Sequence, residues 1–371
     1  MKNNRNEVTF FELLKAGLWE KEPRLSQYED IDYAAIMRMA EEQSVIGLVT
    51  AGLEQVKDVI IPQKWTLQLI GSTLQIEQRN RAMNAFIESL VERFYGADIN
   101  AVLVKGQGIA QCYERPLWRA CGDVDLLLEE EGYERAKAFL MPTASEVETE
   151  FSYFKHLGMT IDGWEVELHG TLWSRLSRRI DCEIDKVQRQ VFSEGSTRVW
   201  KNSSVDVCLP APNEDVIFVF THILHHFFFE GIGLRQICDW CRLLWTYRYE
   251  IDSTLLEKRL RRMGLMSEWK VFAAFAVDSL GMPVDTMPLY DDNPRWKRKA
   301  EKIRSFVMQV GNFGHNSRRN YTGQSYLLRK INSFWGRLSD MLRHLSVFPK
   351  DSIVFFGGVI RSGFHAFLNR E

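Results

Sequence analysis

The chain has 371 residues, of which 45% are hydrophobic and 26% are charged, so it is long enough for two or three domains with a buried core. This composition excludes a disordered chain. The net charge of −2 says nothing about partners, but it is unevenly spread, because Arg295–Glu371 holds 15 Lys and Arg against 4 Asp and Glu. A basic C-terminal quarter on an acidic body invites a hypothesis about a partner.

Residues 1–97 are predicted to form a helical region. Apolar residues recur there at the three- and four-residue spacing of a buried helix face, and Gly96 follows them where a helix-capping glycine would stand. The residues of this apolar stripe are Met83, Phe86, Ile87, Leu90, Val91 and Phe94.

The periodicity changes over residues 98–211, which predict a small α/β domain. Ala101–Val104 and Asp123–Leu128 are short apolar runs typical of strands. A loop and helix over Gly106–Tyr113 separate them, and Tyr133–Leu140 predicts a further helix. Other strands are expected at Val147–Lys155, Trp164–His169, Thr197–Lys201 and Val205–Leu209.

Residues 212–290 predict a helical domain that completes a cleft with the α/β domain. Asn213 is the expected N-cap of its first helix. Gly231 and Gly233 end that helix, and Leu234–Trp245 begins the next one.

The last segment, residues 291–371, is basic and rich in aromatic residues, with helical patterns at Arg295–Val310 and Ser325–Leu345. We expect it to fold back on the acidic body. Nucleic-acid binding and peripheral contact with a membrane are the less favoured alternatives. The expected fold class is therefore α+β, with a small mixed sheet flanked by helical regions.

The cysteine pattern and the hydropathy predict a cytoplasmic protein. Six Cys are scattered along the chain without the density of a disulfide framework, so reduced thiols are expected. The N-terminus lacks the apolar core of a signal peptide, and the longest uncharged apolar stretches are too short to span a bilayer.

Two aspartates at the start of an expected strand form the most informative motif. In Gly-Asp-Val-Asp, residues 122–125, the carboxylates of Asp123 and Asp125 share one face, because side chains alternate along a strand. Two adjacent acids repel each other unless a cation lies between them. Oxygen ligands from two Asp suit Mg²⁺, which binds one or two carboxylates together with substrate phosphates. The alternative is a solvated turn that carries two Asp by chance.

A glycine turn follows the first expected strand. Lys105, Gly106 and Gln107 lie between the strand and the start of a helix. Glycine lets the backbone approach a ligand closely, and the amides that follow can point at a phosphate. The same pattern also occurs in turns that bind nothing.

A third acid is expected on the strand Trp164–His169. Glu165, Glu167 and His169 share one face there. A carboxylate on a neighbouring strand would complete a metal site and could accept a proton from an attacking hydroxyl. Alternation alone does not choose between Glu165 and Glu167, and an ordinary amphipathic edge strand is the alternative.

Together these motifs resemble the nucleotidyltransferase fold shared by DNA polymerase β, poly(A) polymerases and aminoglycoside adenylyltransferases. Its pattern is a glycine turn after the first strand, Asp-hydrophobic-Asp on the second and a third acid on a later strand. Within this superfamily the chain is most similar to a bacterial family of uncharacterised nucleotidyltransferases. The similarity lies in Leu-Val-Lys-Gly at 103–106, Gly-Asp-Val-Asp-Leu-Leu at 122–127, Glu-Leu-His at 167–169 and the region from His222 to Asp239.

The resemblance implies transfer of a nucleoside monophosphate from a nucleoside triphosphate, with ATP favoured, to an unidentified acceptor hydroxyl, with pyrophosphate leaving. Asp123, Asp125 and Glu167 would be the catalytic residues and would hold Mg²⁺ or Mn²⁺. The residues expected to bind the triphosphate are Lys105, Gly106, Gln107, Arg119, Gly122 and Arg235. One departure is that Gly106-Gln107 stands where many members have Gly-Ser or Gly-Gly.

Other functions remain open at this stage. A catalytically silent nucleotide-binding or adaptor protein would keep the same fold, and a metal-dependent phosphohydrolase would use similar carboxylates. His222, His226, Cys238 and Cys241 would suit a zinc site if their two helices brought them together, although buried Cys usually pack as small hydrophobic residues.

The two arginines also have simpler interpretations. Arg235 and Asp239 are four residues apart on one expected helix, which is the spacing of an intrahelical ion pair. Arg119 is either a ligand of the triphosphate or a surface residue beside Trp118.

Overall fold

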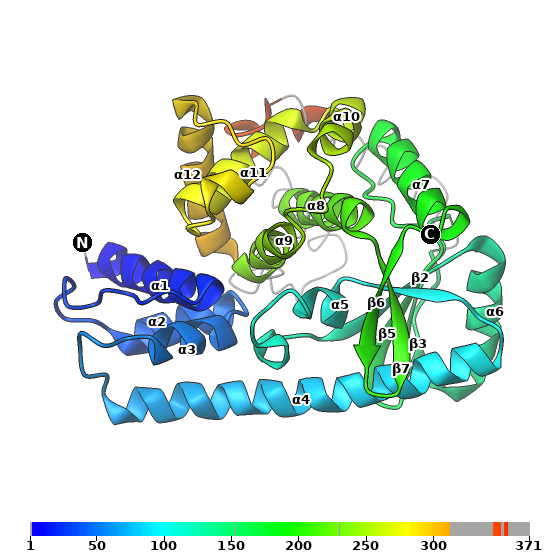
Figure 1. The fold of residues 1–371 in the computed structure, drawn as a ribbon, viewed down its shortest axis with the longest axis horizontal. Coiled ribbons are helices and arrows are strands. Elements are labelled where there is room, and N and C mark those ends of the chain that lie inside the picture. Colours follow the sequence, from blue (N-terminus) through cyan, green and yellow to red (C-terminus); the bar gives the residue numbers. More distant parts are fainter. Residues whose placement is uncertain (1, 152, 230, 312–343, 350–351, 355–371) are drawn as a thin grey trace, which may run out of the picture.

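The computed structural model describes the chain except residues 1, 152, 230, 312–343, 350–351 and 355–371 (Figure 1). A small mixed sheet lies between an N-terminal and a C-terminal group of helices. This arrangement confirms the expected α+β fold class. Among the described helices, none is both long enough and apolar enough to cross a membrane.

The N-terminal group consists of α1 (Lys2–Trp19), α2 (Tyr33–Glu42) and α3 (Ile46–Glu54). Gly17 lets α1 and α3 touch, because a Cβ atom there would lie 1.8 Å from the carbonyl oxygen of Leu48. The long helix α4 (Gln63–Gly96) has 34 residues, which corresponds to about 50 Å. In Figure 1 it runs beneath both this group and the sheet.

The main sheet contains five strands in the order β1-β2-β5-β4-β3. Its strands are β1 (Ala101–Val104), β2 (Asp123–Leu128), β3 (Ala144–Val147), β4 (His156–Ile161) and β5 (Trp164–His169). β2 and β5 are parallel, and the other neighbouring pairs are antiparallel. Short helices join them: α5 (Gly106–Ala110), η1 (Pro116–Trp118), α6 (Glu130–Leu140) and η2 (Met141–Thr143).

The two faces of this sheet differ as the alternation of side chains predicts. Val124, Leu126 and Val166 are buried in one hydrophobic cluster with the apolar stripe of α4. Asp123 and Asp125 lie on the opposite face and line a cavity. The buried face therefore holds the strands in place, and the other face is available for chemistry.

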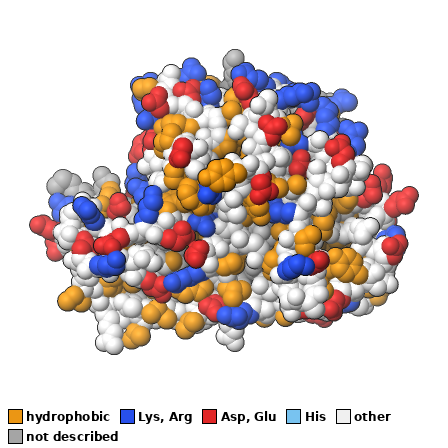
Figure 2. Space-filling model, viewed as in Figure 1, with side chains coloured by type: hydrophobic (Ala, Val, Ile, Leu, Met, Phe, Trp, Pro, Cys, Tyr) orange, Lys and Arg blue, Asp and Glu red, His pale blue; other side chains and the backbone are white. Residues whose placement is uncertain are grey.

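The remaining elements follow the sheet. They are α7 (Arg178–Ser193), the hairpin of β6 (Thr197–Asn202) and β7 (Val205–Pro210), α8 (Pro212–Phe229), α9 (Leu234–Thr246), α10 (Ser253–Met263), α11 (Met266–Asp278), η3 (Val284–Thr286) and α12 (Pro294–Val310). Figure 2 shows Lys and Arg side chains gathered at the upper right, where α7 and α10 lie in Figure 1. The hydrophobic core of α8, α9 and α11 is continuous with that of the N-terminal helices.

The strand predicted at Val147–Lys155 is wrong. β3 ends at Val147, β4 begins at His156, and the loop between them exposes Phe151 and Tyr153. Lys155 has a positive φ of 46°, so the chain reverses directly before β4 and does not remain extended.

Two helix ends also differ from the caps that the sequence predicts. Gly96 is the last residue of α4, and Asp98, with φ 54°, takes the left-handed conformation instead. Helix α8 starts at Pro212, which suits the first position because it needs no N–H partner there. Asn213 therefore lies inside the first turn, where its side-chain oxygen accepts a hydrogen bond of 2.8 Å from the backbone N–H of Asp252.

The described part of the basic C-terminal segment packs on the body. Trp296 and Val307 of α12 are buried in the main hydrophobic cluster, and Arg304 pairs with Glu7 of α1 at 3.0 Å. The second predicted helix, Ser325–Leu345, lies outside the described residues apart from its last two positions.

Candidate functional site

A cavity of about 470 Å³ opens between the acidic face of the sheet and helices α8 and α9. The sheet side contributes Lys105, Asp123, Asp125, His156, Glu167 and His169. The helical side contributes Phe218, Val219, His222, Ile223, His225, His226, Arg235, Gln236 and Asp239. The cavity therefore joins the two regions that the sequence predicts to complete a cleft.

Strand register brings two of the predicted acids together. Asp125 and Glu167 are direct neighbours across the parallel pair β2 and β5, so their side chains emerge side by side on the same face. His169 places its Nε2 atom 2.9 Å from Asp125 Oδ1 and 3.3 Å from Glu167 Oε2. His156, from the neighbouring strand β4, places its Nε2 atom 3.1 Å from the same Glu167 oxygen.

Lys105 supplies positive charge to this cluster. Its Nζ atom lies 2.7 Å from Asp125 Oδ1, and Asp125 is only 2% exposed. Burial alone would lower the pKa of Lys105, but the charges of Asp125, Glu167 and Asp123 outweigh it and raise the pKa. The ammonium group therefore remains charged and balances carboxylates that would otherwise repel one another.

The pKa values of Asp123 and Glu167 are shifted in opposite directions. Burial, followed by the nearby charge of Asp125, raises the pKa of Asp123. Burial would also raise the pKa of Glu167, but hydrogen bonds from His156 and His169 outweigh it and lower this pKa. The cluster is thus strongly polar and partly dehydrated, and opposite charges attract each other more strongly there than in water.

The structure separates the two candidates for the third acid. Glu167 lines the cavity and is bonded by two histidines, whereas Glu165 is exposed and does not line it. Glu165 lies beside Asp123 in the register of β2 and β5. The geometry therefore favours Glu167 as the acid at the site.

Of the residues that the sequence predicts to bind phosphate at the glycine turn, only some line the cavity. Lys105 and Gly106 both have positive φ, 58° and 40°, and line the cavity. Gln107 is buried on the other side, where its amide nitrogen donates to Asn80 Oδ1 at 2.8 Å. Gly122 is exposed, and neither Gln107 nor Gly122 is part of the cavity lining.

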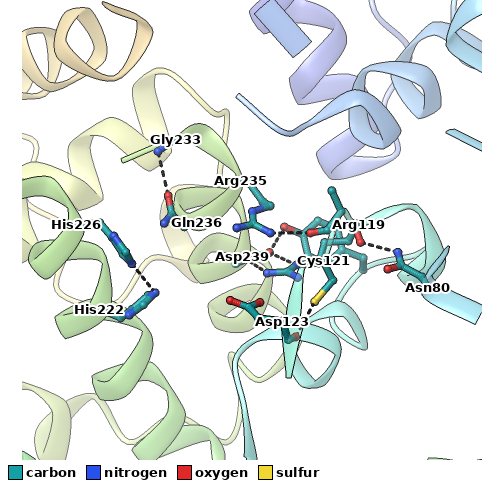
Figure 3. Close-up of polar contacts among 12 residues, drawn as sticks. Asn80, Arg119, Cys121, Asp123, His222, His226, Gly233, Arg235, Gln236 and Asp239 are labelled. Atoms are coloured by element: carbon teal, nitrogen blue, oxygen red, sulfur yellow. Dashed lines mark hydrogen bonds and ion pairs between the residues drawn. The ribbon is translucent and has the colours of Figure 1, made fainter. Parts of the chain in front are cut away.

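Arg119 is buried and not on the surface. Figure 3 shows its guanidinium group facing Asp239 of α9, which it binds through two hydrogen bonds of 3.0 and 2.6 Å. The hydroxyl of Tyr113 donates a further bond of 2.7 Å to Asp239. Asp239 is therefore the partner of Arg119 in a buried ion pair. This bidentate contact ties the entry of β2 to α9.

Arg235 lines the cavity beside the acids. Its Nη1 atom donates to the carbonyl oxygen of Ala120 at 2.8 Å, and its charge lowers the pKa of Asp123 as a minor influence. Figure 3 shows the Arg235 side chain extending from α9 toward the segment that carries Cys121 and Asp123. Of the predicted triphosphate ligands, Lys105, Gly106, Arg119 and Arg235 thus meet at one cavity.

The histidines of α8 form the far wall. His222 and His226 are one turn apart and their Nε2 atoms are separated by 2.9 Å (Figure 3). Cys238 and Cys241 are fully buried in the hydrophobic core. In the part of the chain that the structure describes, the ligand atoms of these four residues do not form one group, and both Cys pack as small hydrophobic residues, which is the interpretation that the sequence favoured.

An aromatic rim borders the cavity and was not predicted from the sequence. Phe151 and Phe154 precede β4, Trp173 follows β5, and all three line the cavity with Arg175. The Arg175 guanidinium lies 4.1 Å from the centre of the Phe154 ring, and the Phe154 and Trp173 rings are 6.3 Å apart. Flat rings beside a cation are suited to stacking on a planar ligand.

Comparison with known families decides the assignment. Residues 29–278, about two thirds of the chain, match the family described as uncharacterised nucleotidyltransferase. The chain belongs to this family. No curated protein and no solved structure matches it. The family match extends well beyond residues 103–239, which carry the sequence motifs, and it includes every residue of the cavity lining.

Proposed function

We propose that this nucleotidyltransferase moves a nucleoside monophosphate from a nucleoside triphosphate, favouring ATP, to an acceptor hydroxyl with the help of a divalent metal ion. The observation that carries the proposal is the cluster of Asp123, Asp125 and Glu167 on one face of neighbouring strands, inside a cavity that also holds cationic side chains. The family match supports the general class of reaction.

The donor set fits the metal that the proposal requires. Asp125 is almost fully buried and its oxygen already accepts from the Lys105 ammonium group, so a positive charge is accommodated at that position. Asp123, Asp125 and Glu167 would hold Mg²⁺ or Mn²⁺. When bound, the metal would neutralise charge on the phosphates during transfer.

The chain's own residues supply the remaining parts of the reaction. The acceptor hydroxyl oxygen forms a bond to the α-phosphorus, and the bond from that phosphorus to the oxygen bridging to the β-phosphate breaks. Pyrophosphate leaves, and Glu167 takes the hydroxyl proton. Lys105 and Arg235 line the cavity and would contact the phosphates as cations, and the aromatic rim would stack on the base.

A turnover assay with the purified protein tests this proposal. Incubation with a nucleoside triphosphate, Mg²⁺ and a mixture of candidate acceptors should release pyrophosphate and form an adduct. Asp123→Asn and Asp125→Asn should abolish both products, because a neutral amide does not offset the metal charge. Glu165→Gln is the matched control and should keep activity. Monophosphate or phosphate without adduct indicates a phosphohydrolase, and binding without turnover indicates a silent adaptor.

A further inference from the structure

Two histidines and a glutamate converge beside the aspartates. His156 and His169 are direct partners across the antiparallel pair β4 and β5, and their ring centres are 4.8 Å apart. Both Nε2 atoms point at one oxygen of Glu167, at 3.1 and 3.3 Å. Among the described residues, His156, Glu167 and His169 form the group that could hold a metal ion: each offers one ligand atom, and the three atoms lie within 4.8 Å of one another.

The chemistry of these atoms differs from that of the aspartate pair. Mg²⁺ prefers oxygen ligands, whereas imidazole nitrogen suits first-row transition metals such as zinc, cobalt and iron. Asp125 Oδ1 lies 2.9 Å from His169 Nε2 and would supply a fourth ligand once the Lys105 ammonium, 2.7 Å from the same oxygen, moves away from it. Two nitrogens and two carboxylate oxygens form a mixed set that a borderline divalent cation favours over Mg²⁺.

We propose that His156, Glu167 and His169, with Asp125, form a binding site for a borderline divalent transition metal such as Co²⁺, Fe²⁺ or Zn²⁺. The inference rests on the proposed metal site of the enzyme and goes further by naming nitrogen ligands and the metal class. Asp125 and Glu167 would be shared with the aspartate pair. The competing explanation is that the histidines only donate hydrogen bonds that hold the carboxylates in place.

Cobalt binding to the purified full-length protein tests this proposal without nucleotide or acceptor. Metal-free protein is titrated with Co²⁺ in the presence of excess Mg²⁺, and the visible absorption of Co²⁺ reports nitrogen coordination. We expect about one Co²⁺ per chain with nitrogen-shifted bands. His156→Asn and His169→Asn should each weaken binding at least about tenfold, the loss typical of damaged metal sites.

Two variants serve as matched controls. Glu165→Gln changes an exposed acid of the same strand, and His222→Asn changes a cavity histidine outside the group; both should bind Co²⁺ like the wild type. Circular dichroism melting should show that all four variants fold. The proposal is overturned if Mg²⁺ displaces Co²⁺, if His156→Asn and His169→Asn bind normally, or if His222→Asn is the variant that loses Co²⁺.

The outcome is separable from that of the proposed function. If the protein binds Co²⁺ through His156 and His169 but transfers no nucleotide, the proposed metal site stands and the proposed transfer is refuted. If the protein transfers nucleotide with Mg²⁺ and binds no Co²⁺, the proposed transfer stands and the transition-metal site is refuted.

Discussion

At the scale of single residues, Lys105 is the group on which the ligand-free site depends. Its ammonium lies 2.7 Å from a carboxylate that is almost fully buried, and the charges of two further acids act on it. Removing one partner of a buried ion pair leaves an uncompensated charge, which is far more costly than losing a surface pair.

Lys105→Met should therefore destabilise the protein by about 3 kcal/mol when a chelator removes divalent metal. Excess Mg²⁺ or Mn²⁺ should restore much of this loss, since the metal supplies the missing positive charge. Thermal melting with and without metal checks both effects. A variant as stable as the wild type in chelator would show that Lys105 does not balance the acids.

The choice between the two glutamates of β5 gives a second test. Glu167→Gln should lower kcat/KM on the order of 10²-fold or more, because it removes a metal ligand and the proton acceptor. Glu165→Gln should leave kcat/KM close to the wild-type value, since Glu165 is exposed and outside the cavity lining. Steady-state kinetics on both variants decide the matter, and the reverse ranking would move the assignment to Glu165.

The sequence predicted the acids of the site and placed His169 beside Glu167, but it did not predict the second histidine partner, His156. Alternation along a strand is a local rule, so it placed Asp123 with Asp125 on one strand and Glu167 with His169 on the other, whereas the pairing of β2 with β5 brings the two sets together. His156 enters the site through pairing of β4 with β5, and that register is not encoded in the residues beside it. The rim residue Trp173 was missed for a similar reason, because its contact with Phe154 is made between two loops that are not adjacent in the sequence.

At the scale of elements, the Arg119–Asp239 pair joins the segment before β2 to helix α9. Both side chains are at most about 8% exposed and are bonded at 3.0 and 2.6 Å. Its loss would let α9 move relative to the acids of β2. The pair is therefore expected to set the geometry of the cavity as well as its stability.

A double-mutant cycle measures this coupling. Arg119→Met or Asp239→Leu alone should each destabilise the protein by about 3–5 kcal/mol, because each leaves a buried charge without its partner. The double variant should cost less than the sum of the two single variants. Denaturant unfolding gives all three values; additive losses would show that the two residues act independently.

Elements with a clear period were predicted more accurately than their connections. Ala101–Val104, Asp123–Leu128 and Trp164–His169 match the observed strands residue for residue, because each is a short apolar or alternating run. The error at Val147–Lys155 came from aromatic residues that favour strands but lie in an exposed loop. There, contacts with Trp173 and Arg175 outweigh local propensity.

At the scale of the whole molecule, the C-terminal segment takes part in the fold. Trp296, Ile303 and Val307 of α12 are buried, and Gln43 of the N-terminal region donates a hydrogen bond of 3.0 Å to the carbonyl oxygen of Val307. The sequence showed the aromatic content and the charge of this segment, but not which surface it covers. That surface is formed by elements far apart in the chain.

Truncation after Asp292 should accordingly expose apolar surface and give aggregated or strongly destabilised protein. Burying a large apolar side chain contributes about 1.5–3 kcal/mol, and α12 alone buries several of them. Size-exclusion chromatography and thermal melting test this expectation. A soluble and fully stable truncation that loses binding to RNA or to anionic vesicles would instead identify the segment as a partner-binding module.

The fate of the α-phosphate tests the central claim most directly. Wild-type protein and the Asp125→Asn variant are each added to a cell extract with Mg²⁺ and ATP radiolabelled at either the α- or the γ-phosphate. We expect a new product that carries the α-label and not the γ-label, formed by the wild type and absent with Asp125→Asn. Label found only in free monophosphate or phosphate, or an adduct formed equally well by Asp125→Asn, would contradict nucleotidyl transfer at this site.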